Sequence, residues 1–408
     1  MSRRICVVFV ALIAVAQTGA DWSQFRGPDN AGRSLETAVP PTEWSVGAEG
    51  PGRGNVRWKA EVPARGVSGP IVVGDRVIVT GAGGPRQDRL HVACYSAADG
   101  RTLWHRQFWA TGRTFCHPTS SVAANTPASD GRRVFAFFSS NDLVCLDLEG
   151  NLLWYRGLTL EHPDAANDVG MAASPLIVGE RVIVQVESKG ASFAAALDAA
   201  TGETRWQTPR KPQMNWTSPT IFRGATGEPL VLLQSPHQLT AHDPATGEVV
   251  WTYEAVCGEI ASAATDGDLI FLPSNGLTAL RCPAGSRNWE KVWQEPALAA
   301  GNASPVVKDG RVYVVNRAGA VACGDAKTGK VLWRMRVKGP FWATPAAVGD
   351  RLYFVNAEGV AQVVRTTDAG GEILAVNKFD EPVLGSPAVA DGALYVRGEK
   401  HLWKIAQP

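Results

Sequence analysis

The sequence has no excess of charge and no long apolar run apart from one near its start. Its 40 basic residues nearly balance 39 acidic ones, which gives a net charge of +1 and no basic stripe to attract nucleic acid or anionic lipid. The motifs His-Glu-x-x-His, Gly-x-Ser-x-Gly, Cys-x-x-Cys and the phosphate-binding glycine loop are absent. These absences argue against the common metallohydrolase, serine hydrolase, dithiol and nucleotide-binding classes.

Residues 1–20 have the organisation of a secretory signal peptide. Arg3 and Arg4 precede an apolar run from Ile5 to Ala16, and small residues follow it. The run is too short to cross a hydrocarbon core of roughly 30 Å. Cys6 lies at the start of the run, not after it, where a lipid-modified cysteine would stand. We therefore expect export to the periplasm or the extracellular space and a soluble mature chain.

Two landmarks recur at intervals of roughly 40 to 50 residues. The first is a small residue followed by proline: Gly69-Pro70, Thr126-Pro127, Ser174-Pro175, Ser218-Pro219, Ser304-Pro305, Thr344-Pro345 and Ser386-Pro387, with Ser262-Ala263 in the remaining repeat. The second is a tryptophan that ends each unit: Trp58, Trp104, Trp154, Trp206, Trp251, Trp293 and Trp333. Each unit holds four short strands, which predicts an all-β, eight-bladed β-propeller of four-stranded antiparallel blades.

The chemistry of each landmark indicates its place in a blade. Proline cannot donate to a strand ladder, so the Ser-Pro element is expected on the innermost strand, whose free edge faces the axis. In the stretch that ends at Trp206, Asp198 can accept the backbone N–H groups of a turn in which Gly202 takes a positive φ. The large tryptophan rings are expected to pack between neighbouring blades.

The two ends of the repeat array complement each other. The last unit, from Gly385 to Ile405, lacks an outer strand, whereas residues 55–60 form a tryptophan-bearing strand without inner partners. We therefore expect the N-terminal strand to complete the C-terminal blade. This gives a signal peptide (1–20), an N-terminal extended segment (21–54) and a propeller (55–408). Two repeats deviate, with Ala375 in place of tryptophan and Ala263 in place of proline.

The cysteines give little support for a disulfide framework. Three of them occupy the same place in different repeats and are expected to be small buried residues: Cys94, Cys145 and Cys323. Cys257 and Cys282 flank the strands of one repeat, and the sequence leaves both a disulfide and free thiols open.

The element Ala-x-Asp-x-x-Thr-Gly-x-x-x-Trp, which ends at Trp206, Trp251 and Trp333, resembles the tryptophan-docking motif of pyrroloquinoline-quinone (PQQ) propellers. The stretches 22–28 and 116–118 are similar to those of secreted bacterial PQQ-like repeat proteins. The resemblance implies one of two functions. Quinoprotein dehydrogenases hold PQQ with a metal ion, an aspartate base and a disulfide of adjacent cysteines. Propellers similar to the BamB-type outer-membrane assembly protein bind no quinone and serve as interaction platforms.

A ligand site, if present, is expected where the residues just before each inner strand converge at a channel mouth. These candidates are Asn125, Met171, Trp216, Glu259, Asn302 and Trp342, with His117 nearby. Two tryptophans and two asparagines can stack on and hydrogen-bond a planar ligand. The alternative, which we favour, is that they fill the channel and satisfy turn backbone.

The sequence contains no adjacent cysteine pair, and no metal ligand or catalytic aspartate can be carried over from the dehydrogenases. We therefore expect a monomeric binding or scaffold module for a protein or cell-envelope partner, with no cofactor and no catalytic residue. The alternative is a PQQ-dependent alcohol or sugar dehydrogenase that uses a metal ion.

Overall fold

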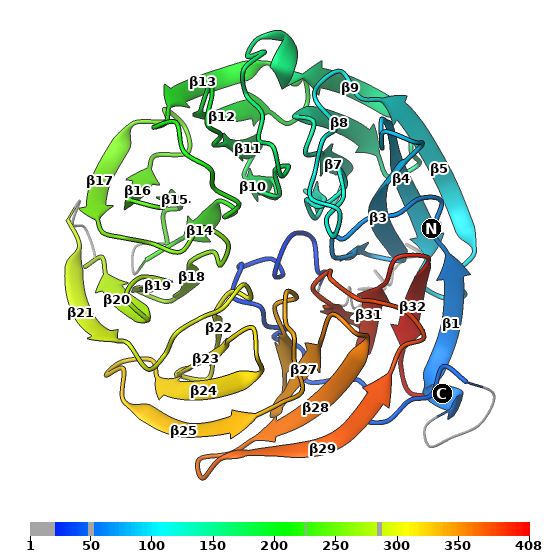
Figure 1. Cartoon of the computed structure of the whole chain (residues 1–408), viewed down its shortest axis with the longest axis vertical. Coiled ribbons are helices and arrows are strands. Elements are labelled where there is room, and N and C mark those ends of the chain that lie inside the picture. The colour runs from blue at the N-terminus through cyan, green and yellow to red at the C-terminus, as the bar shows by residue number, and fades with distance from the viewer. Residues whose placement is uncertain (1–20, 48–52, 225–226, 284–287) are drawn as a thin grey trace, which may run out of the picture.

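The computed structural model describes residues 21–47, 53–224, 227–283 and 288–408. Within these ranges the chain forms eight four-stranded antiparallel sheets arranged in a ring (Figure 1). The helical elements of the described chain are two 3-10 turns, η1 (Arg53–Asn55) and η2 (Leu158–Leu160). The prediction of an all-β, eight-bladed propeller is confirmed. The predicted signal peptide lies outside the described residues.

Each blade runs from an innermost to an outermost strand in chain order, except the eighth. The first four blades comprise β2 (Ile71–Val73), β3 (Arg76–Gly83), β4 (Arg89–Ser96), β5 (Thr102–Trp109); β6 (Ala128–Ser129), β7 (Arg133–Phe137), β8 (Asp142–Asp147), β9 (Leu152–Gly157); β10 (Leu176–Val178), β11 (Arg181–Val186), β12 (Phe193–Asp198), β13 (Thr204–Pro209); and β14 (Thr220–Phe222), β15 (Leu230–Ser235), β16 (Gln238–His242), β17 (Val249–Glu254). The last four comprise β18 (Ala264–Asp266), β19 (Leu269–Leu272), β20 (Leu277–Arg281), β21 (Glu290–Glu295); β22 (Val306–Lys308), β23 (Arg311–Val315), β24 (Ala320–Asp325), β25 (Val331–Arg336); β26 (Ala346–Val348), β27 (Arg351–Val355), β28 (Val360–Thr366), β29 (Gly371–Lys378); and β30 (Ala388–Ala390), β31 (Ala393–Arg397), β32 (His401–Ile405), β1 (Val56–Glu61). As predicted, the strand that follows each Ser-Pro element is innermost.

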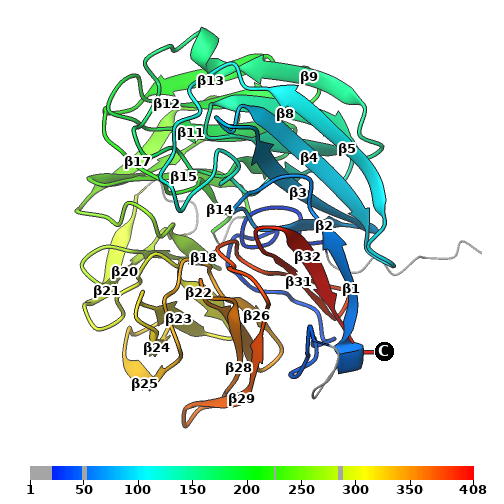
Figure 2. The same cartoon turned by 45° about the vertical axis from the view of Figure 1, so that its right-hand side comes forward.

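The eighth blade closes the ring with strands from both ends of the chain. Strand β1 pairs antiparallel with β32, so that Trp58 lies opposite Lys404 and Lys59 opposite Trp403 (Figure 2). The predicted completion of the C-terminal blade by the N-terminal strand is confirmed. The pairing covers the edge that β32 would otherwise leave open.

Six of the repeat tryptophans contact the next blade in the same way. The indole N–H donates to a backbone carbonyl there at 2.8 to 3.2 Å, in the pairs Trp58 to Ala97, Trp104 to Leu148, Trp154 to Ala199, Trp206 to Pro244, Trp293 to Ala326 and Trp333 to Thr367. The ring of Trp206 lies directly on Gly247, where a Cβ atom would come within 2.5 Å of the ring. Gly247 also has a φ of 76°, so both the turn and the close approach require glycine.

The fifth blade departs from the repeat at two positions, and at both of them the contacts differ from those of the other blades. Its β20–β21 connection lacks the Asp-x-x-Thr-Gly turn, and the indole of Trp251 lies against the thiol of Cys282 instead of a carbonyl. At the proline position, Ala263 donates its backbone N–H to Oε1 of Gln234 at 2.8 Å. Proline has no N–H group to make this bond.

The seventh blade lacks its tryptophan because the eighth has no turn to receive one. Strands β32 and β1 come from opposite ends of the chain, so no hairpin joins them. The N-terminal segment supplies a ring instead. Trp44 is buried and packs on Phe379 with ring centroids 5.9 Å apart, and Phe379 packs in turn on Trp403 at 4.9 Å.

All six cysteines of the described chain are free. Cys94, Cys145 and Cys323 are fully buried, as predicted. Cys257 and Cys282, for which the sequence left a disulfide open, lie in one apolar cluster without being bonded. Burial raises the pKa of the Cys94 and Cys257 thiols to about 12. These thiols therefore stay protonated near neutral pH and are poor nucleophiles.

Candidate functional site

A ring of hydroxyl groups surrounds the axis of the propeller. In blades one to seven, the backbone N–H of the small residue at this position donates to the side-chain oxygen of the equivalent residue in the next blade, at 2.9 to 3.1 Å. The seven accepting residues, which we call the hydroxyl ring, are Thr126, Ser174, Ser218, Ser262, Ser304, Thr344 and Ser386. Gly69 interrupts the ring, since a Cβ atom there would lie 2.5 Å from the carbonyl oxygen of Ser386.

Residues 21–36, which we call the plug, lie inside the ring of blades (Figure 1). They contact the inner strands on the far side of the prolines from the loops, at one end of the axis. In six blades an oxygen of the plug accepts the backbone N–H that lies two residues after the proline. The pairs are Val72 to Trp22, Ser129 to Ser23, Ile177 to Gln24, Ile221 to Asn30, Val307 to Ala31 and Ala347 to Gly32. The plug thus satisfies donors on the free edges of the innermost strands.

Charged side chains fix the plug at two further blades. Arg33 forms ion pairs with Asp29 at 2.9 Å and with Asp266 of the fifth blade at 2.8 Å. The carboxylate of Glu36 accepts the backbone N–H groups of Asp391 and Gly392 in the β30–β31 turn. The plug therefore contacts all eight blades and closes this end of the axis.

The opposite end, which we call the loop face, carries the loops that lead from each outermost strand to the next innermost strand. Three of the predicted site residues connect these loops to one another. Asn125 is buried and donates to the carbonyl of Ala173 at 2.6 Å. Trp216 donates its indole N–H to Gly170 at 2.9 Å and its backbone N–H to the carbonyl of Glu259 at 2.8 Å.

The remaining predicted residues do not join this network in the described structure. Asn302 is half-buried, and Trp342 is exposed beneath the guanidinium of Arg317, whose carbon lies 5.6 Å from a ring centroid. His117 is exposed and hydrogen-bonded to Thr119. Met171 is buried. Asn125, Trp216 and Glu259 thus link neighbouring loops, as expected if these residues satisfy turn backbone.

The described residues do not fit a metal-bound quinone. Among them, no three His, Cys, Asp or Glu side chains come together in a way that could hold a metal ion. Glu259 is the one acidic residue among the predicted site residues, and it is exposed. Glu187 is buried, but its carboxylate is bound by Arg210 at 2.7 Å and by Ser235 at 2.7 Å. A divalent cation with a tricarboxylate quinone needs several converging oxygen ligands.

Three exposed apolar side chains that the sequence did not single out lie at or just after the ends of the outer strands β5 and β9, on the loop face. Trp109 is 64% exposed, Phe115 58% and Leu160 74%; we call these three residues the apolar patch. Together they expose roughly 400 Å² of surface, taking full areas of about 180 to 250 Å² each. Exposed apolar patches of a few hundred Å² on a monomer often mark interaction sites.

The two loops that carry the apolar patch are fixed against each other. Tyr155 donates to the carbonyl of Trp109 at 2.9 Å, and Arg113 forms an ion pair with Asp168 at 3.2 Å. The backbone N–H of His117 donates to the carbonyl of Val169. The patch is therefore presented on a braced surface, which lowers the ordering cost of binding.

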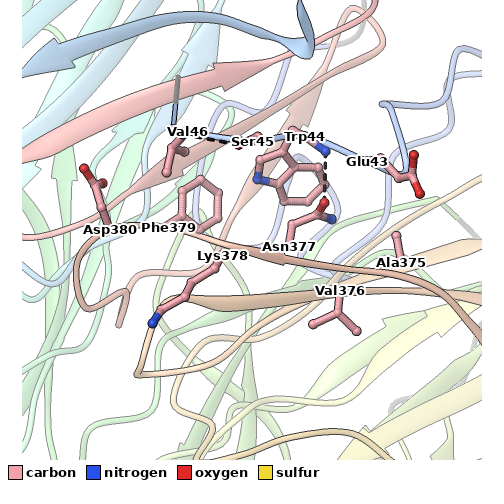
Figure 3. Close-up of a pocket in the computed structure, with 11 residues that line it drawn as sticks. Glu43, Trp44, Ser45, Val46, Ala375, Val376, Asn377, Lys378, Phe379 and Asp380 are labelled. Carbon is pink, nitrogen blue, oxygen red and sulfur yellow. Dashed lines mark hydrogen bonds between the residues drawn. The ribbon is translucent and has the colours of Figure 1, made fainter. Parts of the chain in front are cut away.

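A groove of about 510 Å³ lies between residues 43–47 and strand β29. Figure 3 shows the ring of Trp44 against Phe379. The backbone N–H of Trp44 donates to Oδ1 of Asn377 at 2.9 Å. Val376 and Lys378 point away from this ring on the other side of the strand (Figure 3). The groove marks the place where blade seven has alanine instead of a tryptophan.

Sequence reasoning expected an N-terminal segment at 21–54 but did not place it on the axis as a plug, and it missed the apolar patch. The dense turn residues of stretch 26–32, with glycine at 27 and 32 and asparagine at 30, were the available signal for a compact plug. No periodic signal marks the patch, because its residues lie in loops of unequal length. In the described part of the chain, no helix has the length and apolarity needed to cross a bilayer.

Repeats, ring closure and inner hydroxyls together define an eight-bladed propeller of the PQQ-repeat class. The family model described as "Outer membrane protein assembly factor BamB" matches residues 50–253 and 273–374, and the chain belongs to this family.

Known proteins of two kinds are similar to the chain. It is 26% identical over 330 residues to a polyvinylalcohol dehydrogenase from Pseudomonas sp.. This match covers 69% of the present chain and 46% of the dehydrogenase. The fold matches BamB from Moraxella catarrhalis with a TM-score of 0.62 and 18% identity, over 85% of this chain and 96% of that one. It also matches a quinohemoprotein alcohol dehydrogenase from Comamonas testosteroni with a TM-score of 0.69 and 14% identity, over 94% and 80%. The chain spans less than half of the length of the curated relatives it matches.

Proposed function

We propose that this chain is an exported binding module that docks a protein of the cell envelope on its loop face, through the apolar patch. The observation that carries the proposal is the exposure of Trp109, Phe115 and Leu160 on two braced loops. Aromatic side chains held on a rigid surface supply much of the energy of protein interfaces. The plug closes the opposite end of the axis, so the loop face is the end that stays available.

Two further observations support this proposal. The family model is named for an outer-membrane assembly factor, and that function involves protein partners. The first twenty residues have the pattern of a secretory signal, and export would bring the mature chain to the same compartment as an envelope partner.

Photo-crosslinking tests the proposal directly. A benzoylphenylalanine residue replaces Leu160, and the purified full-length protein is illuminated with native cell envelopes. The matched control carries the same residue in place of Val249, which is 51% exposed on the outer strand β17, away from the loop face. We expect a discrete adduct from position 160 alone, which weakens when Phe115→Ser is added. Equal adducts at both positions, or none, would contradict the proposal.

The second candidate function is a quinone-dependent oxidoreductase. The similarity to a polyvinylalcohol dehydrogenase over 69% of the chain favours it. The poor fit of the described acidic residues to a metal-bound quinone argues against it. We therefore rank it second.

A further inference from the structure

The plug holds a buried positive charge whose hydrogen-bonding capacity is only partly used. Arg26 is 1% exposed, and its Nη2 donates to the carbonyl of Ala263 at 2.6 Å. Its Nε and Nη1 are also buried and have no hydrogen-bond partner among the described residues. The carboxylate of Asp29, which acts on Arg26 through space, is itself bound by Arg33. Burying a charged group without partners is costly, and burial lowers the pKa of Arg26 to about 9.

The backbone of Arg26 adopts a conformation that arginine seldom takes. Its φ is 64°, in the left-handed region, and it precedes Gly27 with a φ of 81°. A non-glycine residue is held in this region only when the surrounding structure fixes it. The hydrogen bonds of the plug to the inner strands supply that constraint. Glycine would adopt this backbone more readily, but it would bring no side chain into the axis.

The hydroxyl ring adds donors beside this guanidinium. Ala263, which accepts from Arg26, directly follows Ser262 of the ring, and Thr220, whose Oγ1 lies 3.4 Å from Nη2, is two residues after Ser218. Each ring oxygen accepts one backbone N–H, and no hydrogen bond donated by these hydroxyls is found among the described residues. Ser218 is 5% exposed, so it is not completely enclosed.

We propose that a monovalent anion of the size of chloride binds on the axis, between the guanidinium of Arg26 and the hydroxyl ring. Nε and Nη1 of Arg26 are buried donors without a partner, the ring hydroxyls can also donate, and no carboxylate of the described residues binds this guanidinium directly. A spherical anion accepts hydrogen bonds from several directions at once and neutralises this charge, whereas water does not. The bound ion fixes the plug to the inner strands of blades four and five.

Bromide tests this proposal because it substitutes for chloride and scatters anomalously. Crystals of the full mature chain are soaked in sodium bromide, and data are collected at the bromine absorption edge. We expect an anomalous peak within about 3.5 Å of Nε or Nη1 of Arg26. Arg397 is the internal control: it is 1% exposed and also has unpartnered Nε and Nη1, but Glu381 and Glu399 lie in its surroundings. No peak is expected beside it.

A second measurement keeps the test decisive if a variant folds poorly. The thermal midpoint of the wild-type protein should rise with sodium chloride more than with equal sodium gluconate, whose anion is too large for the site. Arg26→Gln should lose this difference, and Arg397→Gln should keep it. Bromide peaks at the surface alone, which show an adventitious ion only, or a peak of equal height at Arg397, would overturn the proposal.

Discussion

The contact between Trp206 and Gly247 predicts a specific pattern of stability loss. In Gly247→Ala, the new Cβ atom meets the indole ring at 2.5 Å and the residue must keep a φ of 76°. The left-handed backbone costs about 1–2 kcal/mol for alanine, and overpacking adds about 1–3 kcal/mol. Gly310 is the matched control, because its φ is 71° and no atom lies within 4 Å of a Cβ built there. Gly310→Ala should therefore cost only about 1–2 kcal/mol.

A double-mutant cycle separates the steric term from the backbone term. Trp206→Ala alone should lower the free energy of unfolding by about 3–5 kcal/mol, since it removes a buried ring. In that background the clash is gone, so Gly247→Ala should cost no more than Gly310→Ala. Guanidinium unfolding followed by circular dichroism measures all four variants. Equal costs for the two glycine substitutions in the wild-type background would refute this account of how the blades are held together.

Three further predictions concern other parts of the fold. Burial first, and then the neighbouring charges of His105 and Arg89, lower the pKa of His91 to about 4. The folded state thus favours neutral His91, so stability present above pH 6.5 is lost as the pH falls towards 4, by up to about 3 kcal/mol at 1.36 kcal/mol per pKa unit. Urea midpoints at pH 7 and 4.5 should differ more for the wild type than for His91→Gln; parallel shifts would contradict this. Glu187→Gln should cost about 3–5 kcal/mol because it leaves Arg210 buried without its partner. Adding Arg210→Met should restore part of the loss, and a double variant no more stable than the single one would count against that explanation. Trp251→Ala should cost about 1 kcal/mol less than the equivalent change in a blade whose indole donates to a carbonyl, and thermal unfolding of both tests this.

The sequence was sufficient to predict the blades because their landmarks repeat. Proline at the inner strand and tryptophan at the outer strand each have a physical reason that acts in seven of the eight blades, so single departures do not hide the period. The predicted last unit ends at Ile405, as β32 does, and the pairing of Trp58 beside this strand follows from its unpaired outer edge.

The two departures could not be explained from the sequence, since their compensating residues lie far away along the chain. Trp44 from the N-terminal segment supplies the ring that blade seven lacks at Ala375. Gln234 of the preceding blade accepts the backbone N–H that Ala263 has and proline would lack. The plug is not repetitive, so no period pointed to its contacts. The predicted site residues were chosen by their place in the repeat, which locates them on the loop face but does not give the direction of each side chain.

Titration with PQQ tests most directly the claim that this propeller is a binding module and not a quinoprotein. Purified protein receives PQQ with calcium or a rare-earth ion, and binding and dye-coupled oxidation of alcohols and sugars are measured. We expect no stoichiometric binding and no dye reduction, because Glu259 is the one acidic side chain among the predicted site residues, whereas a metal-bound quinone needs several ligands. Stoichiometric binding with dehydrogenase activity that is lost in Trp216→Ala or Glu259→Gln would contradict the account.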